Sequence, residues 1–263
     1  MSNTKTVLIT GAGSGIGRAL TVEAVKLGFA PLIAGRTLSS MQGTARQAGL
    51  DNNAIVVADV TTPEGRTRLV AAAGEKLDIL INNAGCLSVG HLSDLDDTAL
   101  QRMCDTNLAA PVALTRDMLP ALQAAQGRIV NIGSVFGDIA YPYFAAYSAM
   151  KFGLRGFSDA IRRELSGSGV GVTYVAPRAT RTAAESEFSA LVEPLQMTLD
   201  SAERVATEAW DAIRAGKRES FPRGKERLFV KIQRLLPSLV DKSVGAQARD
   251  QATLNALDTL RRA

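Results

Sequence analysis

The feature that most constrains the fold is a β-branched segment that runs directly into a glycine-rich turn near the N-terminus. Residues 4–10 (TKTVLIT) predict a buried strand. Residues 11–17 (GAGSGIG) form the turn, and 15–28 carry apolar residues at helical spacing up to Gly28. A strand, a glycine-rich turn and a helix in this order aim backbone N–H groups at a phosphate, and glycines permit its close approach. We therefore predict a phosphate-binding turn.

The spacing of the glycines identifies the kind of turn. It does not fit the dinucleotide pattern G-x-G-x-x-G, because Ile16 stands three residues after Gly13. It fits T-G-x-x-x-G-x-G instead, with matches at Thr10, Gly11, Gly15 and Gly17. The alternative is a turn whose glycines only begin a helix.

A tyrosine and a lysine form a second motif in AAYSAMK. Tyr147 and Lys151 are four residues apart in a predicted helix, so both side chains project from one face. A free phenol titrates near pH ~10, and a neighbouring ammonium lowers that pKa by favouring the phenolate. Such a pair can move a proton to or from an alcohol or carbonyl oxygen. Alone, the motif also fits a surface tyrosine beside a solvated lysine.

Two further landmarks lie between these motifs, namely NNAG at 82–85 and Ser134. In this order the four landmarks resemble the short-chain dehydrogenase/reductase family, over roughly residues 4–222. The resemblance implies an oxidoreductase that uses a nicotinamide dinucleotide. It also implies four catalytic residues, which are Asn107, Ser134, Tyr147 and Lys151.

The composition bounds the class of protein. The 263 residues, 46% hydrophobic and 21% charged, fit one α/β domain. No apolar run is long enough to span a bilayer, and no signal-peptide pattern precedes the first strand. Cys86, Cys104 and the single His91 give neither a disulfide framework nor a metal-ligand spacing. We therefore expect a cytoplasmic protein without a metal site.

Strands and helices alternate along the chain, which predicts a parallel sheet with helices on both faces. Further strands are predicted at 31–35, 54–59, 77–82, 128–133, 170–176 and 218–221, and helices at 62–74, 98–125, 145–166 and 201–215, the last with Asp200 as N-cap. The fold expected is α/β, a single doubly wound, Rossmann-like sheet. Residues 1–222 form the dinucleotide-binding and catalytic domain, with a substrate lid at about 183–199, and 223–263 form a C-terminal helical extension.

The end of the second strand selects the cofactor. An acid there would bind the ribose hydroxyls and repel a 2′-phosphate, but the chain has Arg36, which suits a phosphate dianion. We therefore favour NADP(H) over NAD, with a solvated turn residue as the alternative role of Arg36. By resemblance, Asp59 contacts the adenine. The cofactor-binding residues predicted are Thr10, Gly11, Gly13, Ser14, Gly15, Ile16, Gly17, Arg36, Asp59, Val60, Asn83, Ala84, Gly85, Tyr147, Lys151, Pro177, Thr180 and Thr182.

The catalytic roles follow from the resemblance and from side-chain chemistry. Ser134 stands at the end of a strand and would hold the substrate oxygen toward Tyr147. Tyr147 would donate the proton in reduction and accept it in oxidation. Lys151 would lower the pKa of the phenol and hold the nicotinamide ribose, and Asn107 would anchor a water that links Lys151 to solvent.

One position departs from the family pattern. After the sixth strand the family has Pro-Gly and then a threonine, whereas this chain reads Pro177-Arg178 before Thr180 and Thr182. A glycine would ease close approach of the backbone to the nicotinamide. Arg178 faces either a phosphate, the substrate or solvent.

The segment after Thr182 is expected to cover the site. Phe188, Leu191, Val192 and Leu195 fall on one helical face. An apolar cleft would suit a hydrophobic carbonyl or secondary alcohol, whereas the alternative is a face that only packs on the core.

The C-terminal extension is basic and amphipathic. Residues 214–242 contain nine Lys or Arg against three acids. An apolar stripe precedes Pro237, formed by Leu228, Phe229, Ile232, Leu235 and Leu236. We expect it to pack on the domain or on a partner subunit of a homodimer or homotetramer. Less favoured partners of 223–242 are an anionic membrane surface and an acidic carrier protein. We expect no nucleic-acid binding.

The leading function is an NADP(H)-dependent oxidoreductase acting on a hydrophobic carbonyl or secondary alcohol. The second is reduction of a 3-oxoacyl thioester, which only the basic segment favours. A third, of a different class, is a dinucleotide-binding sensor or scaffold without turnover. The intact Ser134, Tyr147 and Lys151 argue against the third, since a sensor needs no proton relay.

Overall fold

A seven-stranded parallel sheet forms the centre of the molecule in the computed structural model, which describes residues 4–224 and 226–262. The strand order is β3-β2-β1-β4-β5-β6-β9, and every neighbouring pair is parallel. The strands are β1 (Thr6–Thr10), β2 (Ala30–Gly35), β3 (Ile55–Val57), β4 (Ile79–Asn82), β5 (Arg128–Ile132), β6 (Gly171–Val175) and β9 (Glu219–Ser220). The predicted Rossmann-like sheet is confirmed.

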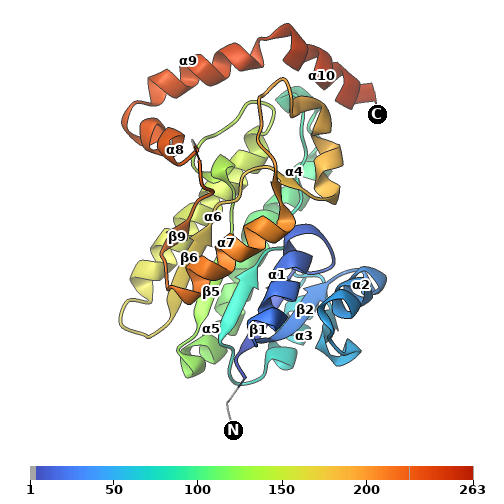
Figure 1. Cartoon of the computed structure of the whole chain (residues 1–263), viewed down its shortest axis with the longest axis vertical. Helices are drawn as coiled ribbons and strands as arrows, with labels where there is room; N and C mark the ends of the chain where they lie inside the picture. The colour runs from blue at the N-terminus through green and yellow to red at the C-terminus, as the bar shows by residue number, and fades with distance from the viewer. Residues whose placement is uncertain (1–3, 225, 263) are drawn as a thin grey trace.

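Helices cover both faces of this sheet (Figure 1). They are α1 (Gly15–Lys26), α2 (Leu38–Ala48), α3 (Pro63–Ala73), α4 (Asp97–Cys104), α5 (Ala110–Ala125), α6 (Ala145–Glu164) and α7 (Ala202–Arg214). Side chains of α1, α2 and α7 share one core cluster with the sheet, and those of α3, α5 and the end of α6 share the other. The three layers follow from strands that are apolar on both sides, such as β4, which is buried throughout.

The order of the strands reverses between β1 and β4, and this positions the site. Chain segments leave β1 and β4 in opposite directions across the sheet, so a crevice opens at their carboxyl ends. The glycine-rich turn, the segment after β4 and the segment after β5 all end at this crevice. The topology therefore brings residues 11–17, 83–85 and 134 together although they are far apart in sequence.

The predicted lid is not an α-helix. Residues 183–199 contain only the 3₁₀ turns η5 (Ala183–Glu187) and η6 (Ser189–Leu191) among their helical segments, all within the described chain. Pro194 explains this, because proline cannot donate a backbone hydrogen bond and disfavours a helical residue before it. A short pair of strands, β7 (Thr180–Arg181) and β8 (Asp200–Ser201), ties the two ends of the lid together.

The C-terminal extension forms three helices, α8 (Glu226–Leu235), α9 (Pro237–Ala248) and α10 (Gln251–Arg262). They arch over the end of the molecule opposite to the N-terminus (Figure 1). Ala256 and Leu257 of α10 are buried against the lid. Lys225, which the sequence analysis counts in the basic segment, lies outside the described residues. Among the described helices, none combines the length and hydropathy needed to cross a membrane.

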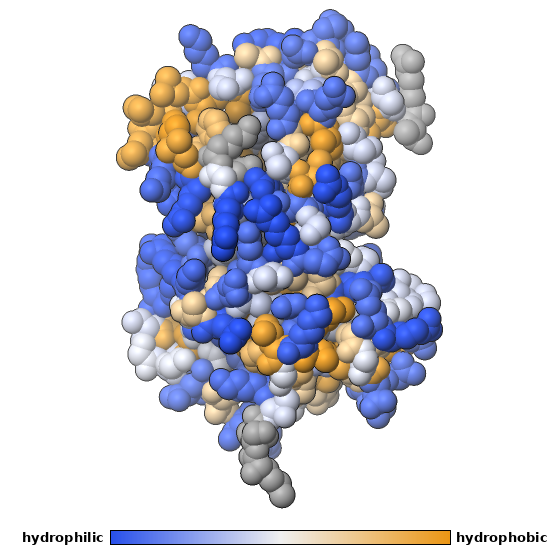
Figure 2. Space-filling view, in the orientation of Figure 1, coloured by the Kyte–Doolittle hydropathy of each residue, from blue (hydrophilic) through white to orange (hydrophobic). Residues whose placement is uncertain are grey.

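Much of the apolar stripe of α8 is exposed, although Phe229 faces the domain across a cavity. Leu228 is 60% exposed, Leu235 79% and Leu236 55%. Figure 2 shows the resulting apolar area over α8 and the start of α9. α8 thus contacts the domain through Val230, which is buried, and through Arg234, while the outer part of the stripe is exposed.

Candidate functional site

The glycine-rich turn is held so tightly that side chains would not fit. Gly11 and Gly15 have φ values of +63° and +50°, which favour glycine. A Cβ on Gly17 would lie 2.2 Å from the Gly11 carbonyl oxygen, and one on Gly15 would lie 2.9 Å from Cγ2 of Thr182. The turn thus presents bare backbone at the N-terminus of α1, where a phosphate would bind.

Thr10 and Asn83 lock this turn to the segment after β4. The Thr10 hydroxyl accepts hydrogen bonds from the backbone N–H groups of Asn83, at 3.0 Å, and Ala84, at 3.1 Å. The Asn83 amide donates in return to the carbonyls of Thr10, at 2.9 Å, and Gly11, at 3.2 Å. Both side chains, predicted as cofactor contacts, are engaged with the backbone and shape the turn.

A cavity of about 320 Å³, the site cavity, opens beside the turn. It brings together most of the residues that the sequence predicts. These are Gly11, Ser14, Gly15, Ile16, Gly17, Asn83, Ala84, Gly85, Asn107, Ser134, Tyr147, Lys151, Pro177, Thr180 and Thr182. Thr10, Gly13, Arg36, Asp59 and Val60 do not line it.

Ser134, Tyr147 and Lys151 meet at the inner end of the site cavity. Ser134 follows β5, and the other two residues come from successive turns of α6. The Lys151 ammonium donates a hydrogen bond of 3.1 Å to the Ile132 carbonyl and lies 5.5 Å from the centre of the Tyr147 ring. Lys151 is buried, whereas Tyr147 keeps part of its surface open to the cavity.

Burial shifts the pKa values of both ionisable groups, and that of Tyr147 moves in the direction opposite to the one predicted. Burial raises the pKa of Tyr147 to about 12, although a hydrogen bond with Ser134 opposes the rise. Burial also lowers the pKa of Lys151 to about 8. The phenol pKa therefore does not fall below its ordinary value as predicted, because burial is the largest influence on it. Tyr147 therefore holds its proton at neutral pH and can act as an acid.

Tyr174 positions Ser134, a role that the sequence analysis missed. Its hydroxyl accepts a hydrogen bond from the Ser134 N–H at 3.4 Å and donates to the Ser134 carbonyl at 3.3 Å. A Cβ on Gly133 would lie 2.1 Å from the Tyr174 ring, so this glycine admits the ring beneath the serine. Gly133 immediately before Ser134 was a signal for such close packing.

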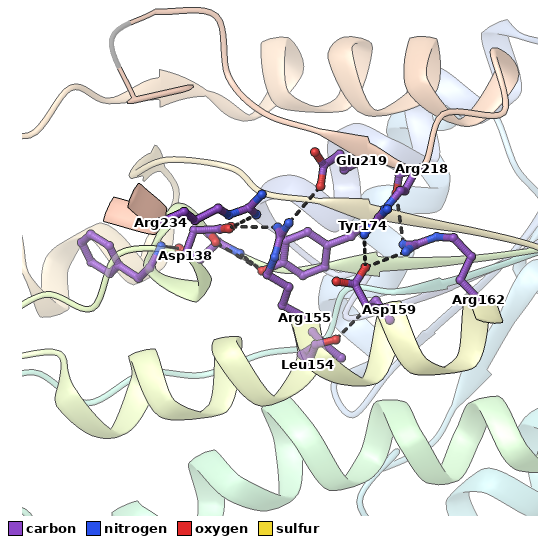
Figure 3. A network of polar contacts seen from close by, with 12 residues as sticks. Asp138, Leu154, Arg155, Asp159, Arg162, Tyr174, Arg218, Glu219 and Arg234 are labelled. Atoms are coloured by element: carbon purple, nitrogen blue, oxygen red, sulfur yellow. Dashed lines mark hydrogen bonds and ion pairs between the residues drawn. The ribbon is translucent and has the colours of Figure 1, made fainter. Parts of the chain in front are cut away.

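A partly buried ionic network supports Tyr174 from its other side (Figure 3). Arg155 of α6 lies over the Tyr174 ring at 5.1 Å and donates to Asp138 and Glu219, both at 2.9 Å. Arg234 of α8 reaches the other oxygen of Asp138, also at 2.9 Å. Burial raises the pKa of Asp138, while the two arginines oppose that rise. The network thus connects the C-terminal extension to the segment that carries Ser134.

Asn107 lies in a π-helical turn, η3 (Asp105–Ala109), between α4 and α5, where the sequence predicts one uninterrupted helix. The side chain is fully buried, with its amide donating to the Cys86 carbonyl at 2.7 Å and accepting from the Cys86 N–H at 3.1 Å. A Cβ on the intervening Gly85 would lie 2.9 Å from the Asn107 oxygen and 3.9 Å from the Lys151 nitrogen. Asn107 therefore fixes the segment after β4 next to Lys151.

Arg178 faces a carboxylate of its own chain. Its guanidinium donates two hydrogen bonds to Asp200, at 2.8 and 2.9 Å, and its side chain is only 10% exposed. The prediction that Asp200 caps α7 is therefore wrong. Ser201 is the N-cap, and its hydroxyl accepts the capping hydrogen bond from the Arg204 N–H. The Thr180 hydroxyl donates to the Arg178 carbonyl at 2.8 Å.

Arg36 and Asp59 lie beyond the site cavity, at the carboxyl ends of β2 and β3. Burial raises the pKa of Asp59, but hydrogen bonds from Thr61 and the charge of Arg36 outweigh it and leave the pKa below its ordinary value. The two side chains therefore lie within electrostatic reach of each other. The exposed Arg36 can meet a ligand that extends past the glycine-rich turn.

The apolar face predicted at residues 183–199 packs mainly against other parts of the described chain. Phe188, Leu191 and Leu195 are buried in one cluster with Phe144 and the end of α10. Val192 only packs against this cluster. The face thus packs on the molecule, as the alternative interpretation held, while Phe188 still borders the cavity.

Comparisons with known proteins agree with this arrangement. A family model described as short chain dehydrogenase matches residues 5–191. The chain is 30% identical to dehydrogenase/reductase SDR family member 7B of Mus musculus, over 93% of this chain and 81% of the relative.

Two solved structures carry a similar fold together with a nicotinamide cofactor. An actinorhodin polyketide ketoreductase variant with NADPH is 26% identical, with a TM-score of 0.74 over 83% of this chain and 95% of its own. A 3-ketoacyl-(acyl-carrier-protein) reductase from Brucella melitensis complexed with NADH has a TM-score of 0.76 at 24% identity, over 82% and 94% of the two chains.

Proposed function

The chain belongs to the short-chain dehydrogenase/reductase family, and from that premise we propose that it is an NADP(H)-dependent reductase of a hydrophobic carbonyl compound. The coarse class follows from membership: it is an oxidoreductase that acts on a carbonyl or alcohol with a nicotinamide cofactor. The observation that carries the finer proposal is the meeting of Ser134, Tyr147 and Lys151 in the site cavity.

The residues around the turn fit a dinucleotide. Gly11, Gly15 and Gly17 leave space that a Cβ would fill, so the pyrophosphate can approach the backbone at the N-terminus of α1. Arg36 supports a 2′-phosphate, because it is exposed at the end of β2 and its charge reaches the adenine-side Asp59. We therefore assign NADP(H), with the adenosine held beyond the turn by Arg36, Asp59 and Val60.

The proton chemistry follows from the shifted pKa values. When bound, the reduced nicotinamide supplies the hydride. Ser134 and the protonated Tyr147 hold the substrate oxygen, and Tyr147 donates its proton as negative charge develops there. Lys151, with a pKa of about 8, is largely charged at neutral pH and stabilises the phenolate that forms. Asn107 keeps Gly85 and the segment after β4 against Lys151.

Reduction is the direction that these groups favour at neutral pH. Because burial raises the pKa of Tyr147 to about 12, the acid form dominates. Oxidation needs the phenolate as a base, so its rate should rise with pH more steeply than that of reduction.

Reduction of a 3-oxoacyl thioester is the second candidate. The basic residues of 223–242 favour it, since they could receive an acidic carrier protein. The reductase from Brucella melitensis, which has a similar fold, supports this candidate only through the substrate that its name states. Detection of turnover with either class of substrate would exclude the alternative of a non-catalytic sensor.

The test is a panel of carbonyl compounds and secondary alcohols, with NADPH and NADH compared for each. We expect turnover with an apolar ketone and NADPH. Tyr147→Phe keeps the ring but removes the proton, so kcat should fall at least about 100-fold with little change in cofactor affinity. If Tyr147→Phe turns over normally, the catalytic assignment is wrong.

We further propose that the protein is cytoplasmic and forms a homodimer or homotetramer. Residues 1–222 form its catalytic domain and 223–263 an extension. The exposed apolar stripe of α8 supports a subunit contact there.

A further inference from the structure

A second cavity, the side cavity, lies between the catalytic domain and the C-terminal helices. It has a volume of about 270 Å³. Phe229 of α8 and Val240, Ser243 and Val244 of α9 form its outer wall. The extension therefore encloses space beside the domain in addition to covering it.

The side cavity shares an entire wall with the site cavity. Five residues line both spaces, namely Val135, Phe136, Arg178, Ala179 and Met197. Phe136 connects this wall directly to the chemistry, because its N–H donates to the Ser134 hydroxyl at 3.1 Å. Met197 is unbranched and flexible, so it can move aside for an elongated ligand. A molecule held at Ser134 thus lies next to the side cavity.

Three polar side chains that line the side cavity, those of Arg178, Tyr141 and Gln247, are engaged within the chain. Arg178 is bound to Asp200 by two hydrogen bonds. Gln247 accepts a hydrogen bond of 2.6 Å from the Tyr141 hydroxyl. The Tyr141 ring in turn stacks on Phe136 with 5.1 Å between the ring centres. The remaining surface is largely apolar, so this space suits hydrocarbon better than a charged group.

We propose that the side cavity holds the apolar tail of an elongated substrate whose carbonyl lies at Ser134 and Tyr147. This inference rests on the function proposed above and narrows its substrate to long-chain carbonyl compounds. Adjacency to the site cavity points to the occupant, since a tail that displaces Met197 and passes Phe136 would enter this space. The C-terminal helices then act in substrate selection.

A chain-length comparison tests the proposal. The full chain is assayed with 2-pentanone and 2-nonanone, each with NADPH and with NADH. Burial of each additional methylene contributes to transition-state binding, so kcat/KM for 2-nonanone should exceed that for 2-pentanone at least about tenfold. Equal values for the two ketones would overturn the proposal.

Val244→Trp should fill the side cavity without touching the site cavity. We expect it to abolish the advantage of 2-nonanone while kcat/KM for 2-pentanone stays within about twofold of wild type. Ser238→Trp is the matched control, because Ser238 is exposed on the same helix and lines neither cavity. If thermal melting finds Val244→Trp unfolded, Ser243→Phe at the rim replaces it. Retention of the 2-nonanone preference in a folded variant contradicts the proposal.

Calorimetric binding of 2-nonanone separates failure of this inference from failure of the proposed function. If neither ketone is reduced with either cofactor, the proposed function fails. The tail site is then judged by binding alone, which Val244→Trp should weaken at least about tenfold and Ser238→Trp should leave unchanged. Equal affinity in wild type and Val244→Trp rules the tail site out.

Discussion

Lys151 is a buried cation whose charge destabilises the fold at neutral pH. Its folded pKa of about 8 lies below the ordinary 10.5, because burial disfavours the ammonium. Between these pH values the unfolded chain binds more protons than the folded one, so folding becomes more favourable as the pH rises. Below pH ~8 both states are protonated and the destabilisation is complete. A catalytic role would explain why such a residue is kept.

Lys151→Met should remove this pH dependence. From pH 7 to pH 9.5, wild type should gain about 2 kcal/mol of unfolding free energy relative to Lys151→Met, through linkage to the lysine. Urea denaturation of both proteins at several pH values measures the difference, and shared tyrosine titration cancels in the comparison. A constant difference across this range would mean that Lys151 is not desolvated. Turnover and cofactor affinity should both fall in the variant.

Arg36 is the single side chain that we expect to set the preference for NADPH over NADH. Arg36→Asp replaces attraction of a 2′-phosphate by repulsion and offers the ribose an acceptor. The ratio of kcat/KM for NADPH over NADH should fall at least about tenfold, which corresponds to ~1.4 kcal/mol. Both cofactors are compared at fixed low salt, since screening weakens exposed charges. A wild type that prefers NADH would reassign the cofactor to NAD.

The sequence predicts the role of a residue well where a local motif contains it. It predicts that role poorly where the residue acts through a partner far away in the sequence. Tyr147 and Lys151 share one helix, so their spacing alone places them together. Tyr174 acts on Ser134 across 40 positions, and although Gly133 leaves space for a close neighbour, it does not identify Tyr174 as that neighbour. The direction of the Tyr147 pKa shift was also mispredicted, because burial cannot be read from spacing.

At the scale of elements, the Arg178–Asp200 pair joins the two ends of the lid. The pair connects the segment after β6 to β8, and both side chains are almost completely buried. It stands where the resemblance to the family led us to expect a glycine near the nicotinamide. The arginine thus replaces that glycine with a clamp on the β7–β8 pair.

Asp200→Asn should leave the buried Arg178 charge without its carboxylate. Removing one partner of a buried ion pair costs about 3 kcal/mol of unfolding free energy. The double variant Arg178→Gly with Asp200→Ala should recover part of this loss, because no uncompensated charge remains. Urea denaturation of the single and double variants forms the measurement. A double variant no more stable than Asp200→Asn would contradict the expected cost of an unpaired Arg178 charge.

Helices with a clear apolar period were predicted with nearly correct ends, and the exceptions have local causes. The helices at 15–28 and 145–166 are observed as α1 and α6 with ends shifted by two residues or fewer. The lid has helical spacing at Phe188, Leu191 and Leu195, but Pro194 prevents the helix and the same side chains pack from 3₁₀ turns. The π-turn around Asn107 was not predicted, because one extra residue per turn leaves the apolar period nearly unchanged.

At the scale of the whole molecule, the exposed face of α8 and α9 is the feature that the fold leaves open. Leu228, Leu235, Leu236 and Leu239 are each more than half exposed. Arg227, Lys231 and Lys242 surround them and are exposed as well. Two occupants fit an apolar area with a basic rim, a second copy of the chain or an anionic membrane surface, and they differ in the sign of their salt dependence.

We expect a second copy, so that the stripe forms a subunit contact. Like charges would then face each other across the contact, and added salt should strengthen association by screening them. Leu235→Glu should shift the protein toward monomer, whereas Leu92→Glu, which changes a leucine that is 71% exposed on the 3₁₀ turn η2 (Leu92–Asp94), should not. Light scattering over a range of protein and salt concentrations measures this. A monomer that floats with anionic vesicles at low salt and is released at high salt would instead assign the face to a membrane.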